Sequence, residues 1–314
     1  MPERPWLSIV MPAWNGERYL EAALQSVQAE GTRGYEIVAV DDGSTDRTPH
    51  ILRAWAERLP LRIVAHGGRG NWVAASNAAL RGGRGRYACF LHQDDLWLPG
   101  RLAALEREVK DGPSLVVHPA VFIGPEAQRL GAWGCPLPEG DVDAALFAER
   151  LAVQNFIAIP AAAFDRERAL RLGAMDESLW YTADWDLWLR LGREGAIRHV
   201  PSPLAAFRVH ADSQTMVRTD LADRREQLEI VLDRHTTALP SAARRAARFS
   251  LEVNVALAAW ASGAPVRWNG LIGSFLRLGP WGLRRYLRDS RIFERVLSRA
   301  RLRLAAPLSA APAA

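Results

Sequence analysis

The feature that most constrains the fold of this chain is the alternation of β-rich and helical segments through its first hundred residues. Short apolar runs alternate with stretches whose apolar residues recur at helical spacing, and turn residues separate them. The expected strands are residues 6–14, 35–42, 61–66 and 86–95, and the expected helices are residues 17–30, 47–59 and 73–83. This order predicts an α/β fold with a mostly parallel central sheet flanked by helices.

Acidic residues stand at the ends of two of these strands. Asp41 and Asp42 end the second strand, and Asp94 and Asp95 end the fourth, within CFLHQDDLWLPGRL. Carboxyl ends of parallel strands share one edge of a sheet, where ligands of α/β sheets bind. Turn or helix-capping roles would also explain these acids, because Asp is favoured in turns and in first helical turns. The functional alternative is that one carboxylate holds Mg²⁺ or Mn²⁺ beside a ligand phosphate, while Asp95 serves the following turn.

Two later segments carry further candidate groups. Asp184 and Asp186 are two residues apart in an expected helix, so they do not share a face and their roles should differ. One can face a cleft as a base while the other pairs with an arginine or caps the helix. Arg208, His210 and Ser213 follow an expected strand, where such groups hold phosphate or metal or are ordinary surface residues.

Composition and motifs exclude several classes of protein. Two cysteines among 314 residues exclude a disulfide framework and a four-cysteine zinc site. The segments GGRGNW and GGRGRY do not match a dinucleotide-binding fingerprint, and no P-loop motif occurs. No long apolar segment opens the chain and no run of about 20 apolar residues follows, so we expect neither signal peptide nor membrane span. A cytoplasmic protein is the resulting expectation.

A basic amphipathic segment lies near the C-terminus, within residues 281–303. It spaces five arginines three or four residues apart: Arg284, Arg288, Arg291, Arg295 and Arg299. Roughly opposite them fall five apolar residues: Leu283, Tyr286, Leu287, Phe293 and Leu297. Such a helix either lies on an anionic membrane surface, here the inner face of the cell membrane, or packs on the rest of the protein with a solvated basic face. Nucleic acid is not an expected partner, because no binding motif accompanies the charge.

Five segments, in this order, resemble the family 2 glycosyltransferases with the GT-A fold. They are SIVMPAWNGERYL, YEIVAVDDGSTD, SNAAL with YACFLHQDDLWLPGRL, LGAMDESLWYTADWDLWLRL and FRVHADSQT. The resemblance is to the bacterial surface-polysaccharide type. It implies metal-dependent transfer of a sugar, with inversion, from a nucleotide-sugar such as a UDP-sugar to a hydroxyl of a glycan or lipid-linked acceptor. A non-catalytic nucleotide-sugar-binding or scaffold protein on the same fold is the alternative.

The resemblance also implies a domain organisation. A GT-A domain would occupy residues 1–215, with a nucleotide-sugar half at about 1–112 and an acceptor half at about 113–215. A helical extension would follow at 216–305, and the low-complexity tail 306–314 is expected to be disordered.

The resemblance assigns site residues position by position. It implies Asp184 as the general base, and Asp94 and His210 as metal ligands. The donor-binding residues that it implies are Pro12, Ala13, Trp14, Glu17, Asp41, Asp42, Asn77, His92, Gln93, Asp94, Arg208 and His210. The chain departs from the family in that His92 replaces the first acid of the D-x-D motif. Whether His92 would bind metal, sugar or ribose, or none of these, is left open by the sequence.

Overall fold

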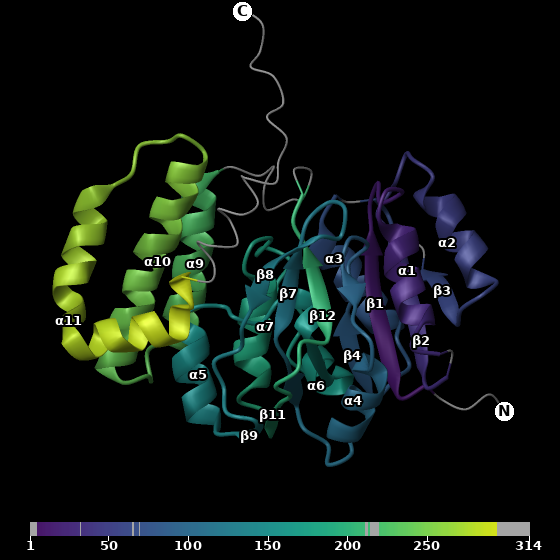
Figure 1. Ribbon diagram of the computed structural model, residues 1–314, viewed down its shortest axis with the longest axis horizontal. Helices are drawn as coiled ribbons and strands as arrows, with labels where there is room; N and C mark the ends of the chain where they lie inside the picture. Colours follow the sequence, from purple (N-terminus) through teal and green to yellow (C-terminus); the bar gives the residue numbers. More distant parts are fainter. Residues whose placement is uncertain are drawn as a thin grey trace, which may run out of the picture.

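An eight-stranded sheet forms the centre of the computed structural model (Figure 1). The structure describes residues 5–31, 33–64, 66–68, 70–210, 213 and 220–293. In order across the sheet, the strands are β3 (Leu61–Val64), β2 (Tyr35–Asp41), β1 (Leu7–Ala13), β4 (Tyr87–Phe90), β10 (Ala162–Asp165), β6 (Leu115–Val117), β11 (Ile197–His199) and β9 (Gly140–Val142). The first four are parallel, whereas β10 is antiparallel to both neighbours.

Helices cover both faces of the sheet. They are α1 (Leu20–Gln28), α2 (Thr48–Ala56), α3 (Trp72–Gly82), α4 (Arg101–Glu108), α5 (Ala144–Val153), α6 (Arg166–Arg171) and α7 (Ala183–Leu191), with a 3₁₀ turn η1 (Ile159–Ala161). Successive residues of β1 point to opposite faces, so Ile9 joins one core with α1 and α2, and Val10 joins another with α3 and α7. Because both faces are buried there, β1, β2 and β4 are largely apolar and do not alternate between apolar and polar residues. The predicted α/β fold is confirmed.

A second, four-stranded sheet lies beside the central one. Its order is β5 (Leu96–Trp97), β12 (Ala205–Arg208), β7 (Ala120–Ile123) and β8 (Arg129–Trp133). The expected strand at 86–95 therefore ends at Phe90, and residues 96–97 pair with β12 in the other sheet. Likewise, the apolar run 115–124 is two strands in different sheets, separated at His118–Pro119, where proline cannot donate to a ladder.

Three helices form the C-terminal part of the described chain: α9 (Leu221–His235), α10 (Ser241–Ala261) and α11 (Trp268–Ser290). They pack together and against α5, on the side of the molecule away from β1–β3 (Figure 1). Helix α11 bends at Gly279, whose φ of 68° leaves the helical region, with Pro280 next in the chain. None of the described helices is long and apolar enough to cross a membrane.

The predicted basic stripe agrees only in part with this structure. Tyr286 is buried against Phe249 of α10, so part of the apolar side packs within the protein. Arg295, Leu297 and Arg299 lie outside the described residues, as does the tail 306–314. The division at about residue 215 stays a prediction.

Candidate functional site

The loops after β1 and β2 meet at the carboxyl edge of the sheet. Ala13 is the register partner of Asp41, and the backbone N–H of Asp42 donates to the Ala13 carbonyl at 2.8 Å. Side chains then tie the two loops together, since the Asn15 N–H donates to Ser44 Oγ at 2.9 Å. The Glu17 carboxylate accepts from the Arg47 N–H at 3.1 Å. Glu17 is therefore held within this pair of loops.

The loops after β1 and β4 are joined by an amide pair. Gln93 Oε1 accepts from the Trp14 N–H at 2.7 Å, and Gln93 Nε2 donates to the Trp14 carbonyl at 2.9 Å. A Cβ on Gly16 would come within 2.3 Å of Gln93 Oε1, so this approach requires glycine. Gln93 thus fixes the backbone of Trp14, whose side chain remains half exposed. Pro12 and Ala13 are buried beneath it.

The two acids that end β2 have different surroundings. Asp41 Oδ1 accepts from the Ser44 N–H at 3.1 Å, which is the turn role that its position allows. Asp42 is buried, and its Oδ2 accepts from the Asn71 N–H at 3.0 Å. His66 Nε2 lies 3.6 Å from the other carboxylate oxygen. Asp42 therefore connects the edge of the sheet to the start of α3.

His92, Asp94 and Asp95 form a compact group after β4. Each offers one nitrogen or oxygen atom, and these atoms lie within 4.8 Å of one another. Within the described chain, His92 Nε2 and Asp95 Oδ2 have no hydrogen-bond partner although both are buried. Burial lowers the pKa of His92 and outweighs the opposing effect of Asp94, so the ring is neutral at neutral pH. A neutral imidazole beside two carboxyl groups is a donor set that suits a divalent cation.

The two carboxyl groups of this cluster differ in protonation. Burial opposes ionisation of Asp94, but the hydrogen bond from His210 Nε2 to its Oδ2, at 3.0 Å, helps to lower its pKa. Burial and the neighbouring Asp94 raise the pKa of Asp95 well above its usual range. The expectation that Asp95 serves the following turn is wrong. Its Oδ1 accepts from the Arg208 N–H in β12, 113 residues later, at 3.0 Å.

Arg208 braces this cluster from the second sheet. Its Nε donates to the Asp94 carbonyl at 2.8 Å, and its Nη1 donates to the Gly124 carbonyl at 2.8 Å. The guanidinium lies over the Tyr19 ring, 4.6 Å from the centroid, and the His210 ring packs on the same tyrosine at 4.9 Å. His210 thus contacts Asp94 without belonging to the three-residue group. Its role as a metal ligand, and the phosphate role of Arg208, stay predictions.

The two acids of α7 have opposite environments, as the sequence predicts. Burial raises the pKa of Asp184 to about 6, against the lowering effects of the Trp185 N–H and of Asn155. Asn155 Nδ2 donates to Asp184 Oδ2 at 3.0 Å. Asp186 instead accepts from Arg190 Nε at 2.8 Å and lies 2.9 Å from His235 Nε2. Although burial opposes it, these partners lower the Asp186 pKa to about 2, so Asp186 is a structural anion joining α7 to α9.

Two neighbouring residues at the start of α3, Asn71 and Trp72, connect these parts, and sequence reasoning missed them. The Asn71 side chain caps α3 and donates to the Glu177 carbonyl at 3.0 Å. The Trp72 ring contacts His92 edge to face, with centroids 5.1 Å apart, and its Nε1 donates to the Trp180 carbonyl at 2.9 Å. The segment before α7 is thereby held beside the His92 group. Asn before a helical segment was the available signal for the cap.

Asn77 lies farther along α3 and is fully buried. Its Nδ2 donates to the Met175 carbonyl at 2.8 Å, and its Oδ1 accepts from the Met175 N–H at 3.0 Å. The amide therefore holds the segment before α7, and its predicted contact with a donor stays a prediction.

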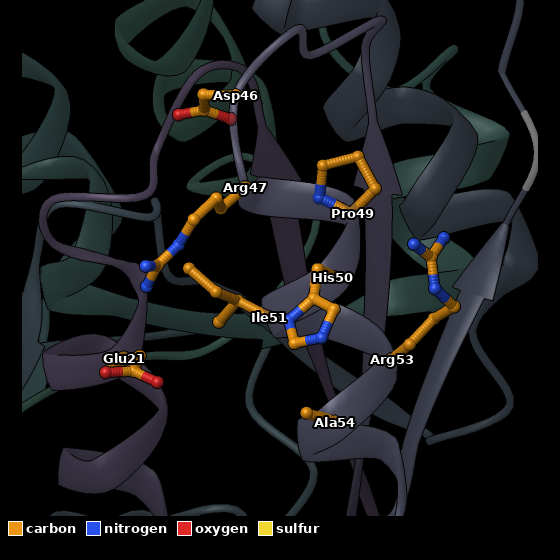
Figure 2. A pocket seen from close by; sticks show the side chains of 8 residues that line it. All are labelled: Glu21, Asp46, Arg47, Pro49, His50, Ile51, Arg53 and Ala54. Carbon is orange, nitrogen blue, oxygen red and sulfur yellow. The ribbon is translucent and has the colours of Figure 1, made fainter.

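A cavity of about 550 Å³ lies elsewhere, between α1 and α2 (Figure 2). Its lining residues include Glu21 of α1 and Arg47, His50 and Arg53 around α2. Figure 2 shows Arg47 and Arg53 on opposite sides of this cavity, so the basic groups do not converge. None of the predicted site residues lines it. We therefore place the candidate site at the carboxyl edge of the sheet.

Comparisons with known proteins bear on the family and the fold of the chain. Residues 8–134 match the model of Glycosyl transferase family 2. An uncharacterized glycosyltransferase of Rickettsia prowazekii is 27% identical over 242 residues, which are 71% of this chain and 70% of the relative. One of Haemophilus influenzae is 20% identical over 241 residues, covering 75% of this chain and 79% of the relative.

Solved structures share the fold. S. aureus TarS (residues 1–349), in complex with UDP-GlcNAc, has a TM-score of 0.64 at 16% identity, covering 95% of this chain and 89% of that one. The mannosyltransferase PcManGT from Pyrobaculum calidifontis, in complex with GDP-Man and Mn²⁺, has a TM-score of 0.54 at 19% identity, covering 97% and 89%. At these identities the likeness concerns the fold alone.

Proposed function

Because residues 8–134 match the model of Glycosyl transferase family 2, we propose that this chain transfers a sugar from a nucleoside diphosphate to an acceptor hydroxyl with inversion. The observation that carries the proposal is Asp184, a carboxylate whose pKa is raised to about 6 by burial. A general base works best when its pKa is near the operating pH, since it is then both ionised and basic enough to take a proton. Asp184 would take the proton of the acceptor hydroxyl as that oxygen attacks the anomeric carbon.

The donor would lie along the carboxyl edge of β1, β2 and β4. Asp41 and Asp42 offer carboxylates for a nucleoside, and the exposed face of Trp14 offers a flat apolar surface beside them. TarS binds UDP-GlcNAc and PcManGT binds GDP-Man on the same fold, which supports a nucleotide-sugar here. Neither neighbour specifies the base or the sugar for this chain. The acceptor would be a glycan or a lipid-linked glycan, approached from the half of the domain that contains α7.

The residues after β4 fit a divalent cation. The fit rests on the buried His92 Nε2 and Asp95 Oδ2, which lack hydrogen-bond partners in the described chain, together with the ionised Asp94. We propose that Asp94 binds Mg²⁺ or Mn²⁺ and that the neighbouring His92 is a second ligand. His210 would orient the Asp94 carboxylate. Such an ion, when bound, would offset the charge that grows on the departing diphosphate. PcManGT was solved with Mn²⁺, which supports this choice of metal.

The chain's own residues would perform the remaining tasks. Asn155 holds the Asp184 carboxylate in one orientation, and Trp72 keeps the segment before α7 beside His92. Arg208 and Tyr19 keep the loop of Asp94 against the second sheet. No covalent intermediate is needed, because direct displacement at the anomeric carbon inverts its configuration in one step.

A panel of nucleotide-sugars tests the proposal. Wild-type protein is incubated with UDP- and GDP-sugars, with and without Mn²⁺, and release of the nucleoside diphosphate is measured. Turnover with one donor is expected, and saturable binding without any turnover would favour the non-catalytic alternative. Asp184→Asn should abolish turnover and retain donor binding.

Calorimetry tests the proposed metal site independently of the proposed base. Asp94→Ala should lose the Mn²⁺-dependent part of donor affinity, whereas Asp233→Ala, which removes an exposed acid paired with Arg248, should not. Equal donor affinity with and without Mn²⁺ in the wild-type protein would remove the metal from the proposal while leaving Asp184 untouched.

A further inference from the structure

Exposed apolar side chains gather at one place on the molecule. In the part of the chain that the structure describes, eight of the ten exposed large hydrophobic residues lie within residues 260–293. The other two are Trp14, in the candidate site, and Ile63. Single exposed apolar residues need no explanation, but a cluster of this kind marks an interaction surface.

Four of these residues form a stripe on the first arm of α11, which we define as residues 268–278. The apolar stripe consists of Trp268, Ile272, Phe275 and Leu276, whose exposed fractions are 62%, 53%, 48% and 76%. At 100° per residue they fall within an arc of about 100°. Leu278 packs this arm on the protein and is buried with Phe249 of α10. The stripe borders this packed face, because the Phe275 ring also contacts the Phe249 ring with centroids 5.8 Å apart. About half or more of each side chain in the stripe nevertheless remains exposed.

The second arm of α11, residues 281–290, is basic. It contains three arginines and one acid, Asp289, and Arg277 and Arg291 flank it. Asp289 is fully buried and pairs with Arg288, and Glu149 of α5 pairs with Arg285. Arg277 and Arg284 lie on the surface and give this part of the helix its exposed positive charge. Trp281, 73% exposed, shares the outer face of this arm with Arg284 and Leu287. Figure 1 shows α11 at the outer edge of the molecule, on the side away from β1–β3.

We propose that α11 is a docking surface for an anionic lipid bilayer, with the apolar stripe inserted at the interface and the basic arm on the headgroups. Trp, Phe and Leu on one helix face with arginines beside them match the chemistry of helices that lie in the membrane plane. Tryptophan favours the boundary between headgroups and acyl chains; Trp268 stands at the start of the stripe, and Trp281 stands at the start of the second arm, and both are exposed. A second copy of the chain would need apolar surface alone, and the excess of arginine would then repel its own copy.

This surface differs from the predicted segment 281–303. The apolar contact lies earlier, on residues 268–276, and the residues from 294 onward lie outside the described chain. The inference does not depend on sugar transfer, because none of the residues on this surface belongs to the candidate site. Binding to lipid and turnover of a donor can therefore fail separately.

Vesicle co-sedimentation of the full chain tests the inference. Vesicles of phosphatidylcholine alone are compared with vesicles of equal parts phosphatidylcholine and phosphatidylglycerol. Wild-type protein should pellet with the anionic vesicles. The triple variant Trp268→Gln, Ile272→Gln, Leu276→Gln should bind them at least about tenfold more weakly, since it removes three exposed apolar side chains.

Charge variants test the arginines of α11, with one residue changed in each arm. Arg277→Gln with Arg284→Gln removes two exposed arginines, each worth about fivefold near an anionic surface, so binding should fall by about 30-fold. Arg53→Gln with Arg171→Gln removes equal charge elsewhere and is the matched control. Ile63→Gln is the control for the apolar variant. Thermal unfolding and donor binding should be unchanged in all of them.

Three results would overturn the proposal. The first is equal pelleting of wild-type protein and the triple variant. The second is equal loss in the control variants. The third is a concentration-dependent dimer, seen by analytical ultracentrifugation, that the triple variant abolishes while neither protein pellets with vesicles, because a second copy would then cover the stripe.

Discussion

Replacing Asp184 with asparagine should abolish transfer and, at the same time, stabilise the fold. Burial raises the pKa of Asp184 from 3.8 to about 6, so ionising this group is harder in the folded protein than in the unfolded chain. This free-energy cost of ionising Asp184 is absent at pH values below its pKa in the unfolded chain. It is fully present at pH values above its pKa in the folded protein. At about 1.4 kcal/mol per pH unit, the difference amounts to about 3 kcal/mol at pH 8.

Asparagine removes this cost because it carries no charge at any pH. Its carbonyl can still accept the Asn155 Nδ2–H bond, so the local geometry is retained. Asp184→Asn should therefore raise the free energy of unfolding by about 3 kcal/mol at pH 8, and by less than about 1 kcal/mol at pH 4. A gain in stability with loss of activity is the usual consequence when a buried catalytic charge is neutralised.

Urea unfolding at several pH values measures this gain, with turnover measured in parallel. Asp233→Asn is the control, since it makes the same substitution at an exposed carboxylate paired with Arg248. The wild-type rate should rise with pH through about 6 and level off above it, because the base must be ionised. An Asp184→Asn protein that is less stable than wild type at pH 8, or one with wild-type turnover, would refute the reasoning.

Three further predictions concern other contacts. Asp186→Asn should lower the free energy of unfolding by about 2 kcal/mol at pH 7, because the pKa of Asp186 is lowered from 3.8 to about 2 in the folded protein. In urea unfolding, this difference from wild type should disappear as the pH falls from 3.8 to below about 2. Leu278→Ala should lower the unfolding free energy by about 3 kcal/mol in urea, since it leaves a cavity between α10 and α11. Trp72→Phe keeps a ring on His92 but loses the bond to the Trp180 carbonyl, so kcat should fall about tenfold with little change in donor KM; an unchanged kcat would contradict the positioning role.

The parallel part of the sheet could be predicted because its signal is local. In β1, β2 and β4, apolar runs ending in polar residues specify both the strand and the edge where it ends. The second sheet could not be predicted in this way. Residues 115–123 read as one apolar run, and only pairing with distant strands assigns β6 to one sheet and β7 to the other. Two residues of β5 carry too little pattern to be recognised at all.

The candidate site, too, could be predicted from the sequence only where its signal is local. The sequence shows which acids stand at strand ends, and the resemblance marks Asp94 and Asp184, but their protonation depends on groups far away in the chain. Asp95 is placed by the backbone of Arg208, and Asp184 by Asn155, 29 residues before it. These partners carry no periodic signal, because a single side-chain hydrogen bond constrains two positions and nothing between them.

The contrast between Asp184 and Asp186 shows why this distant information decides the chemistry. Both carboxylates lie in the first turn of α7, where the helix dipole favours ionisation of each. Asp186 has Arg190 and His235 as partners and remains ionised far below neutral pH. Asp184 has only a neutral amide from another element, so burial dominates and its pKa rises to about 6. The proposed base is thus the acid that has no cationic partner within the described part of the chain, and that property comes from what packs against α7 rather than from α7 itself.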